Sequence, residues 1–253
     1  MTGGTLHGKV ALVTGGGEGF GRAIAGAFAM EGADVAILDR LEEHLDEVVG
    51  EVERHGRRAY AIHADVTETD RLPSLVDSVV AELGDLDTLV HNAGVQVITT
   101  ALEMTEDEWD LAMDVNAKGL FFCSQAVGRY LVEHDKPGKI VNLGSTRAVT
   151  VTKGMPSYAA SKGAVLQITR ALAAEWAERG INVNAIGPTI SYTTHTKDRL
   201  DDPEFREAYL ANLPARRFPE PKDIADAAVF LAGPRSDFIH GEMLMVDSGQ
   251  TIV

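Results

Sequence analysis

Tyr158 and Lys162 are the two residues whose types and spacing could together move a proton. They are four positions apart, so on a helix they would lie on one face, one turn from each other. A free tyrosine has a pKa of about 10 and is a poor base at neutral pH, but a nearby ammonium group favours the phenolate. The pair could therefore exchange a proton with an alcohol oxygen near neutral pH. Because this spacing also arises by chance, the alternative is a surface lysine beside a half-buried tyrosine.

A glycine-rich segment near the N-terminus has the sequence context of a dinucleotide-binding loop. An apolar run at 10–13 predicts a buried strand, five of the eight residues at 14–21 are glycine, and 22–31 is helical in character. Glycine lets the backbone turn tightly and approach a pyrophosphate, and the helix N-terminus supplies oriented N–H groups. We therefore interpret 14–21 as a phosphate-binding loop rather than an ordinary turn.

Asp39 ends the second predicted strand, at 35–38, and follows Gly21 by 18 residues. An acidic residue about 20 positions beyond such a loop binds the ribose hydroxyls of adenosine. Its charge would also repel a 2′-phosphate, so the sequence favours NAD over NADP. Arg40 leaves the second possibility open because a guanidinium could accept that phosphate. A purely structural alternative is that Asp39 is the polar residue at which a strand ends.

The rest of the chain alternates strands and helices in the order needed to bring these motifs together. Further strands are predicted at 59–63, 86–90, 139–143, 181–186 and 243–246, and further helices at 41–55, 71–83, 105–133, 157–179 and 224–231. Six unbroken β-α steps predict an α/β fold, a single Rossmann-type domain over residues 1–253. We expect a doubly wound, mostly parallel seven-stranded sheet with helices on both faces. Ligands bind such sheets beyond the carboxyl ends of the strands, and the residues that follow those ends are Gly15, Asp39, Asp65, Asn92, Ser145 and Pro188.

Composition disfavours several classes of partner. The 253-residue chain has a formal net charge of −15 and a pI of about 4.9, so nucleic acid and anionic membrane surfaces would repel it. The single cysteine, Cys123, stands in an apolar run and is expected to be buried rather than nucleophilic. The N-terminus lacks a signal pattern and no apolar run nears the ~20 residues of a membrane span, so we expect a soluble cytoplasmic protein. No cluster has metal-ligand spacing, and no metal is expected.

Taken together, these motifs resemble the short-chain dehydrogenase/reductase family nearly end to end. The matching segments are the glycine loop, Asp65-Val66, Asn92-Ala93-Gly94 and the four positions Asn116, Ser145, Tyr158 and Lys162. The interval from Ser145 to Tyr158 also fits the family. The resemblance implies an NAD-dependent oxidoreductase that acts on a secondary alcohol or its ketone, and it implies a homotetramer.

The resemblance also implies a role for each of the four catalytic positions. Tyr158 is the general acid/base, and Ser145 orients the reacting oxygen. Lys162 binds the nicotinamide ribose and lowers the Tyr158 pKa, while Asn116 holds a water that links Lys162 to solvent. The cofactor carries the hydride, and the protein supplies geometry and proton transfer. The cofactor-binding residues implied are Gly15, Gly17, Glu18, Gly19, Phe20, Asp39, Asp65, Val66, Asn92, Ala93, Gly94, Tyr158, Lys162, Pro188, Ser191 and Thr193.

The sequence departs from the family pattern at four positions. His91 stands where asparagine is common, and Phe20 stands where isoleucine is common. Thr189 and Ser248 each replace a glycine. None of the four belongs to the catalytic positions. Thr189 is the departure expected to alter the backbone beneath the nicotinamide.

Substrate is expected to meet a polar and partly basic surface. The residues predicted to face it are Gln96, Arg147, Met155, Tyr192 and His195, with the irregular segment 189–218 as a loop or lid of one or two short helices. Basic residues gather there in an acidic chain, namely Arg147, Lys153, His195, Lys197 and Arg199. They suggest an anionic hydroxy acid such as a sugar acid, and the alternative is that they are solvated loop charges. Segments 170–177, 213–217 and 240–241 are more weakly similar to the gluconate 5-dehydrogenase branch.

Three alternative functions stay open from the sequence. The first is an NADP-dependent carbonyl or 3-oxoacyl reductase of the same family. The second is an S-adenosylmethionine methyltransferase, which also uses a glycine loop and an acidic residue after its second strand but leaves Ser145, Tyr158 and Lys162 unexplained. The third is a dinucleotide-sensing protein without catalysis, against which the intact set of four positions argues.

Overall fold

One parallel sheet organises the computed structural model, which describes residues 4–192 and 196–253. Its seven strands lie in the order β3-β2-β1-β4-β5-β6-β7, and neighbouring strands pair in parallel. The strands are β1 (Val10–Thr14), β2 (Asp34–Asp39), β3 (Ala59–His63), β4 (Thr88–His91), β5 (Gly138–Leu143), β6 (Ile181–Pro188) and β7 (Met243–Val246). The Rossmann-type fold predicted from the sequence is confirmed, with a sheet that is parallel throughout rather than mostly parallel.

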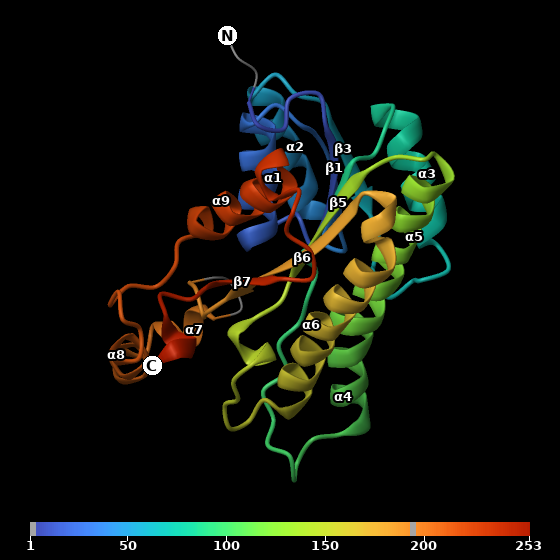
Figure 1. Cartoon of the computed structure of the whole chain (residues 1–253). Coiled ribbons are helices and arrows are strands. Elements are labelled where there is room, and N and C mark those ends of the chain that lie inside the picture. The colour runs from blue at the N-terminus through green and yellow to red at the C-terminus, as the bar shows by residue number, and fades with distance from the viewer. Residues whose placement is uncertain (1–3, 193–195) are drawn as a thin grey trace.

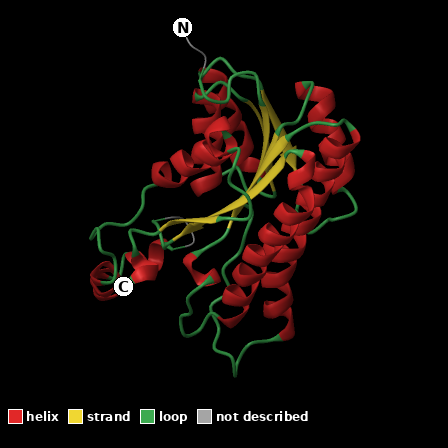
Figure 2. Cartoon of the chain, viewed as in Figure 1, coloured by secondary structure: helices red, strands yellow, loops and turns green. Residues whose placement is uncertain are grey.

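Figure 1 and Figure 2 show that helices cover both faces of the sheet. One face carries α1 (Gly19–Met30), α2 (Leu45–Arg54) and α9 (Pro221–Ala232), and the other carries α3 (Leu72–Leu83), α4 (Glu106–Met113), α5 (Leu120–Glu133) and α6 (Pro156–Trp176). Two short helices, α7 (Lys197–Leu200) and α8 (Pro203–Ala211), follow the carboxyl end of β6. Within the described parts of the chain, the helices fall short of the length and apolarity that a bilayer span requires.

Alternation along the strands builds a core on each face. Leu89 of β4 and Ile140 of β5 pack with α3, α5 and α6, whereas their successors Val90 and Val141 pack with α1, α2 and α9. Successive side chains of a strand point to opposite faces, and here both faces are covered. The strands therefore read as short continuous apolar runs, which is why the sequence locates them.

The helix predicted at 105–133 is interrupted in the structure. It opens at Thr105 with the expected capping box, but the turn η2 (Asp114–Gly119), between α4 and α5, is π-helical. Such a turn carries one more residue than an α-helical turn and often marks a functional site. Gly119 lies so close to Val66 that a Cβ on it would come within 3.0 Å of that residue. The wide turn brings Asn116 to the segment that follows β4.

Several element ends also differ from the sequence prediction. The helices predicted at 41–55 and 157–179 contain 3-10 turns at one end, Glu42–His44 and Ala177–Arg179. The strand predicted at 181–186 continues to Pro188 because it gains β7 as a second neighbour. These differences leave the order of elements unchanged.

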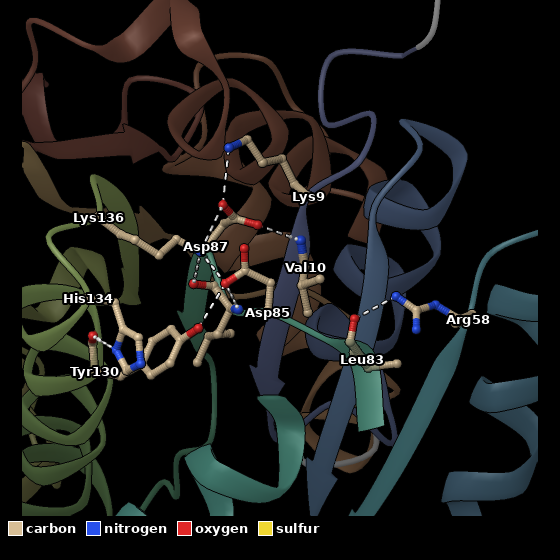
Figure 3. Close-up of polar contacts among 10 residues, drawn as sticks. Lys9, Val10, Arg58, Leu83, Asp85, Asp87, Tyr130, His134 and Lys136 are labelled. Carbon is tan, nitrogen blue, oxygen red and sulfur yellow. Dashed lines mark hydrogen bonds and ion pairs between the residues drawn. The ribbon is translucent and has the colours of Figure 1, made fainter. Parts of the chain in front are cut away.

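Polar contacts fix the amino-terminal edge of the sheet, away from the edge expected to bind ligands (Figure 3). Asp87, just before β4, accepts hydrogen bonds from Lys9 Nζ at 3.1 Å and from the first N–H of β1 at 2.9 Å. Nearby, Asp85 contacts Lys136 and accepts a hydrogen bond from the Tyr130 hydroxyl at 2.8 Å. Burial alone would raise the pKa of Asp85, but these hydrogen bonds outweigh it and hold the pKa below its ordinary value. The cluster ties β1, β4 and α5 together and so fixes how their other ends meet.

Candidate active site

A cavity of about 680 Å³ opens at the carboxyl ends of the strands. Its volume lies within the ~300–1,000 Å³ that is typical of small-molecule sites. The half beside β1, β2 and β3 is lined by Glu18, Asp39 and Asp65. The half beside β5 and β6 is lined by Arg147 and Lys162. One cavity therefore joins an acidic half to a basic half.

Most residues singled out in the sequence line this cavity. They are Gly15, Glu18, Gly19, Phe20, Asp39, Asp65, Val66, Asn92, Ala93, Gly94, Gln96, Ser145, Arg147, Met155, Tyr158, Lys162, Pro188 and Ser191. Gly17, Asn116 and Tyr192 are not part of the lining. Tyr192 is 49% exposed and donates its hydroxyl hydrogen bond to Asp201, so it is engaged outside the cavity. Thr193 and His195 lie outside the described residues.

The glycine loop is a tight backbone cradle between β1 and α1. Gly15 has a φ of +61°, a conformation that favours glycine. Asn92 Nδ2 donates to the Gly15 carbonyl at 2.6 Å and so ties the loop to the end of β4. A Cβ on Gly21 would come within 2.0 Å of the Gly15 oxygen. The loop therefore depends on bare backbone, as a pyrophosphate site at a helix N-terminus does.

Gly21→Ala is expected to abolish dinucleotide binding, because the new methyl group must displace the backbone of the loop. Gly26→Ala is the matched control in the same helix, since nothing lies within 4 Å of its added Cβ. That control should gain stability, by up to about 1 kcal/mol, from better helix propensity. The thermal shift produced by NADH measures both effects. An NADH shift of parental size in Gly21→Ala would contradict the assignment of the loop.

Asp39 is held at the end of β2 by two backbone hydrogen bonds. Its Oδ2 accepts from the Gly17 N–H at 2.8 Å and its Oδ1 accepts from the Leu41 N–H at 3.0 Å. Gly17 does not line the cavity itself, but its N–H helps to orient the Asp39 carboxylate, which does. Arg40, the next residue, is exposed but also borders the cavity. The carboxylate is fixed in place, whereas the guanidinium faces solvent.

Tyr158 and Lys162 lie in the first turns of α6, on the face predicted from their spacing. Lys162 Nζ is 5.8 Å from the centroid of the Tyr158 ring and donates a hydrogen bond to the Leu143 carbonyl at 2.7 Å. Ser145 follows β5, and its hydroxyl is near enough to Tyr158 to act on the pKa of the phenol. The strand end and the helix start therefore bring a serine, a tyrosine and a lysine to one wall of the cavity.

Asn116 acts one layer behind that wall. Its Oδ1 accepts from the Val95 N–H at 2.8 Å, and its Nδ2 donates to the Val95 carbonyl at 2.9 Å and to Ser161 Oγ at 2.9 Å. The side chain is 1% exposed. These contacts clamp the segment after β4 against α6, next to Lys162. The geometry gives Asn116 a positioning role, and its expected water contact stays a prediction.

Burial and the neighbouring groups act on the pKa of Tyr158 in opposite directions. Burial raises the pKa of Tyr158 above its usual value, while the hydrogen bond with Ser145 and the charge of Arg147 act in the opposite direction. Lys162 is itself buried, which lowers its pKa to about 8. Its ammonium group is turned toward the Leu143 carbonyl rather than the phenol. The charge of Arg147 therefore also favours the phenolate, and the lowering of the Tyr158 pKa by Lys162 stays a prediction.

His91 is a neutral core histidine behind the site. It is 1% exposed, and its Nδ1 shares a hydrogen bond with Thr14 Oγ1 at 3.2 Å. Burial, aided by the nearby charge of Lys162, lowers the pKa of His91 to about 3. The asparagine common here in the family could make the same hydrogen bond, but it would not titrate.

His91 should make the protein sensitive to acid. Between its unfolded pKa of about 6.5 and its folded pKa of about 3, the unfolded chain binds a proton that the folded chain does not. Lowering the pH from 7 to 5 should then cost about 2 kcal/mol of unfolding free energy through this residue. His91→Asn should remove that part of the loss, as measured by urea denaturation at both pH values. Equal losses in parent and variant would show that His91 is not buried as a neutral group.

The sequence analysis missed a polar network on the far wall of the cavity. The Tyr209 hydroxyl of α8 contacts Thr189 Oγ1 at 3.1 Å, and Thr189 Oγ1 donates to Gln250 Oε1 at 2.6 Å. All three line the cavity, as does Arg199 of α7. Thr189, the departure from the family pattern, thus joins the end of β6 to α8 and to the C-terminal segment. The sequence analysis predicted short helices in the polar segment 189–218, where α8 lies. It contained no signal for Gln250.

The cavity fits a nicotinamide dinucleotide by two observations besides its size. The glycine loop presents bare backbone to the cavity at Gly15 and Gly19, and it packs so tightly behind them that a Cβ on Gly21 would lie 2.0 Å from the Gly15 oxygen. Ser191 is 3% exposed, lines the cavity, and its hydroxyl has no hydrogen-bond partner among the described residues. A buried unpartnered hydroxyl is costly unless a ligand satisfies it. Asp39 would meet the adenosine ribose, and Ser191 would meet the nicotinamide end.

Known sequences resemble this chain over almost its whole length. Residues 15–251 match the sequence profile of the family described as Enoyl-(Acyl carrier protein) reductase. The chain is 38% identical over 245 residues to 2-dehydro-3-deoxy-D-gluconate 5-dehydrogenase from Escherichia coli (strain K12), which covers 97% of this chain and 96% of that protein. It is 41% identical over 249 residues to galactitol 2-dehydrogenase (L-tagatose-forming) from Cereibacter sphaeroides, with 98% and 96% covered.

Solved structures of other proteins share the fold over almost the whole chain. A gluconate 5-dehydrogenase from Burkholderia cenocepacia, in complex with NADP and tartrate, superposes with a TM-score of 0.93 at 34% identity over 98% of this chain and 97% of that chain. Carveol dehydrogenase from Mycobacterium avium, in complex with NAD, has a TM-score of 0.93 at 29% identity over 99% and 100%. The two neighbours bind nicotinamide dinucleotides that differ in the 2′-phosphate.

Proposed function

The chain belongs to the short-chain dehydrogenase/reductase family, and we propose that it transfers a hydride between NAD(H) and a sugar acid or another polar hydroxy compound. Family membership makes it an oxidoreductase of CH–OH groups with a nicotinamide dinucleotide cofactor, and it removes the methyltransferase alternative. The observation that carries the finer proposal is the shared cavity. Ser145, Tyr158 and Lys162 face the same space as the glycine loop, with basic side chains at the substrate end.

Proton transfer is the chemistry that this chain itself supplies. The nicotinamide ring, when bound, takes the hydride from the alcohol carbon or returns it to the ketone carbon. Tyr158 takes the hydroxyl proton during oxidation and gives it back during reduction. Ser145, whose side chain lines the same cavity as Tyr158, holds the same oxygen. Lys162 is placed to bind the nicotinamide ribose, and the segment 189–218 serves as the substrate lid.

The direction of the reaction should depend on pH. Burial favours the protonated form of Tyr158, because it raises the pKa of the phenol. At neutral pH the side chain is therefore ready to act as an acid toward a ketone. Alcohol oxidation needs the phenolate and should become faster as the pH rises.

We propose NAD as the preferred cofactor because of the fixed carboxylate at Asp39. The charge lies where the adenosine ribose is expected, and a 2′-phosphate there would meet a like charge. Arg40 faces solvent and is less suited to a buried phosphate contact. The preference is a proposal for this chain, since a structural neighbour binds NADP.

The second candidate is an NADP-dependent carbonyl or 3-oxoacyl reductase. The description of the matched family profile favours it. A long acyl chain would need an apolar path, which Met155, Ile190 and Phe205 supply in part, but the same cavity also presents Arg147 and Arg199. We therefore place it behind the hydroxy-acid proposal.

An absorbance assay at 340 nm tests the proposed function. Purified protein is incubated with NAD and a panel of aldonates and alditols, or with NADH and the matching ketones. We expect turnover that requires NAD(H) and Tyr158. Binding of NADH without turnover of any alcohol or ketone would instead support the third alternative, a dinucleotide-sensing protein.

A homotetramer in the cytoplasm is proposed on the family resemblance and composition alone. Leu120, Val165 and Leu166 are buried within this chain's own core, so they do not supply a face for a second subunit. Exposed apolar side chains on α4 and α5, such as Trp109 and Val132, are better candidates. Light scattering that shows a monomer at micromolar concentration would exclude the tetramer.

A further inference from the structure

Arg147 is an arginine in the cavity that has no acidic partner among the described residues. The chain has 38 acidic residues against 23 lysines and arginines, and other partly buried cations such as Arg22 and Lys136 are paired with carboxylates. Arg147 instead donates from Nη1 to Thr150 Oγ1 at 2.8 Å and from Nη2 to the Tyr209 hydroxyl at 3.3 Å. Both partners are neutral, so the positive charge is uncompensated in an acidic protein.

The position of Arg147 is next to the reacting groups. It stands two residues after Ser145, in the short helical turn Thr146–Ala148 that follows β5, and its backbone N–H donates to Ser145 Oγ at 3.1 Å. Its charge also reaches the Tyr158 hydroxyl. An anion bound by this guanidinium would therefore lie close to the carbon that exchanges the hydride.

The guanidinium is also held in a fixed orientation. Thr150 comes from the turn after β5, and Tyr209 comes from α8. Two separate segments therefore accept hydrogen bonds from the Arg147 guanidinium. Arginine has five N–H donors, and these two bonds leave others for a ligand. A planar fork with free donors matches a carboxylate, to which it can bind through two parallel hydrogen bonds.

A second arginine adds to the positive charge at the substrate end of the cavity. Arg199 of α7 lines the cavity, and its Cζ lies 4.5 Å from the centroid of the Phe205 ring. Lys153 and Lys197, which the sequence also suggested, are exposed and are not part of the lining. Among the residues that the structure describes, the basic character of the substrate half comes from Arg147 and Arg199, together with Lys162.

We propose that Arg147 binds the carboxylate of the substrate and so makes this site selective for hydroxy acids over neutral sugar alcohols. The proposal rests on the proposed function and deepens it. The distinction matters because relatives at similar identity carry names of both kinds, one for a sugar acid and one for galactitol. Neither the catalytic positions nor the fold separates these two substrate classes.

Binding to the NADH-loaded protein tests the proposal without requiring turnover. Calorimetry would compare two matched pairs, D-gluconate with D-glucitol and D-threonate with D-threitol, in which CH₂OH replaces the carboxylate. We expect the acids to bind the parent protein tighter by on the order of 10–100-fold, as charged hydrogen bonds allow. Arg147→Gln should bring each acid to within about threefold of its alcohol, and Arg147→Lys should keep part of the preference.

Lys153→Gln is the matched control for a general loss of positive charge. Lys153 is exposed and does not line the cavity, so the ratio of acid to alcohol affinity should stay near the parental value. If Arg147 only held α8 in place, Arg147→Gln would weaken acids and alcohols by the same factor. That result would overturn the proposal, and so would a parent protein that binds no aldonate tighter than its alditol.

Failure of this proposal can be told apart from failure of the proposed function. If the parent protein gives no thermal shift with NADH, the oxidoreductase assignment itself fails. If NADH binds and alditols are oxidised, but acids have no advantage that depends on Arg147, only the carboxylate site fails.

Discussion

Tyr158→Phe is expected to lower kcat/KM by roughly 10²–10⁴-fold, the usual contribution of a positioned general acid or base. The substitution removes one oxygen from the wall of the cavity and leaves the ring that packs beside Lys162. Without the hydroxyl, residue 158 can no longer accept the alcohol proton as the hydride leaves. Initial rates with saturating NAD, measured over a range of substrate concentrations, give the ratio.

Two measurements separate lost chemistry from lost folding. The thermal shift with NADH should stay close to that of the parent, because the glycine loop and Asp39 are untouched. Tyr130→Phe is the matched control, since it removes a phenol oxygen that contacts Asp85 at the opposite edge of the sheet. It should keep activity within about twofold of the parent while losing some stability, on the order of 1 kcal/mol for the hydrogen bond. A Tyr158→Phe enzyme with a tenth or more of parental activity would remove Tyr158 from the mechanism.

Asp39→Asn is expected to shift cofactor preference from NAD toward NADP by on the order of 10²-fold or more. A like charge facing a 2′-phosphate costs several kcal/mol, and each 1.4 kcal/mol is about tenfold. Asparagine keeps the shape of the side chain and one of the two acceptor oxygens now bound by the Gly17 and Leu41 N–H groups. The ratio of kcat/KM for NAD to that for NADP measures the change.

Arg40→Ala tests the competing view of the same corner of the cavity. If Asp39 sets the preference, Arg40→Ala should change the NAD/NADP ratio by no more than a few-fold. If instead Arg40 binds a 2′-phosphate, its removal should selectively weaken NADP. A parent protein that prefers NADP, with the preference lost in Arg40→Ala, would reverse the cofactor proposal.

The fold could be predicted because its signals are local. Each buried strand is a short apolar run, and the motifs after the strand ends fall on one edge as the parallel sheet requires. The π-helical turn that carries Asn116 could not be predicted in this way. Residues 105–133 hold no helix-breaking proline, and the wide turn accompanies the close approach of Gly119 to Val66 and the bonds from Asn116 to Val95.

The sequence predicts those site residues that are spaced regularly within one element. It does not predict the contacts between residues from segments far apart in the chain. The step from Tyr158 to Lys162 follows from helix geometry. The spacing could not reveal the hydrogen bond from Lys162 to the Leu143 carbonyl, or the charge of Arg147 that favours the phenolate. Likewise, Thr189, Tyr209 and Gln250 meet only after the chain returns from α8 and β7, so spacing alone does not place them together.

The central claim is that one cavity brings an alcohol oxygen to Tyr158 beside a bound nicotinamide ring. A crystal structure of this chain with NAD and D-gluconate tests that claim most directly. We predict the adenosine ribose at Asp39, the nicotinamide ribose at Lys162, and a substrate hydroxyl within hydrogen-bond distance of both Tyr158 and Ser145. A nicotinamide that lies away from Tyr158, or a substrate hydroxyl held by other groups, would contradict it.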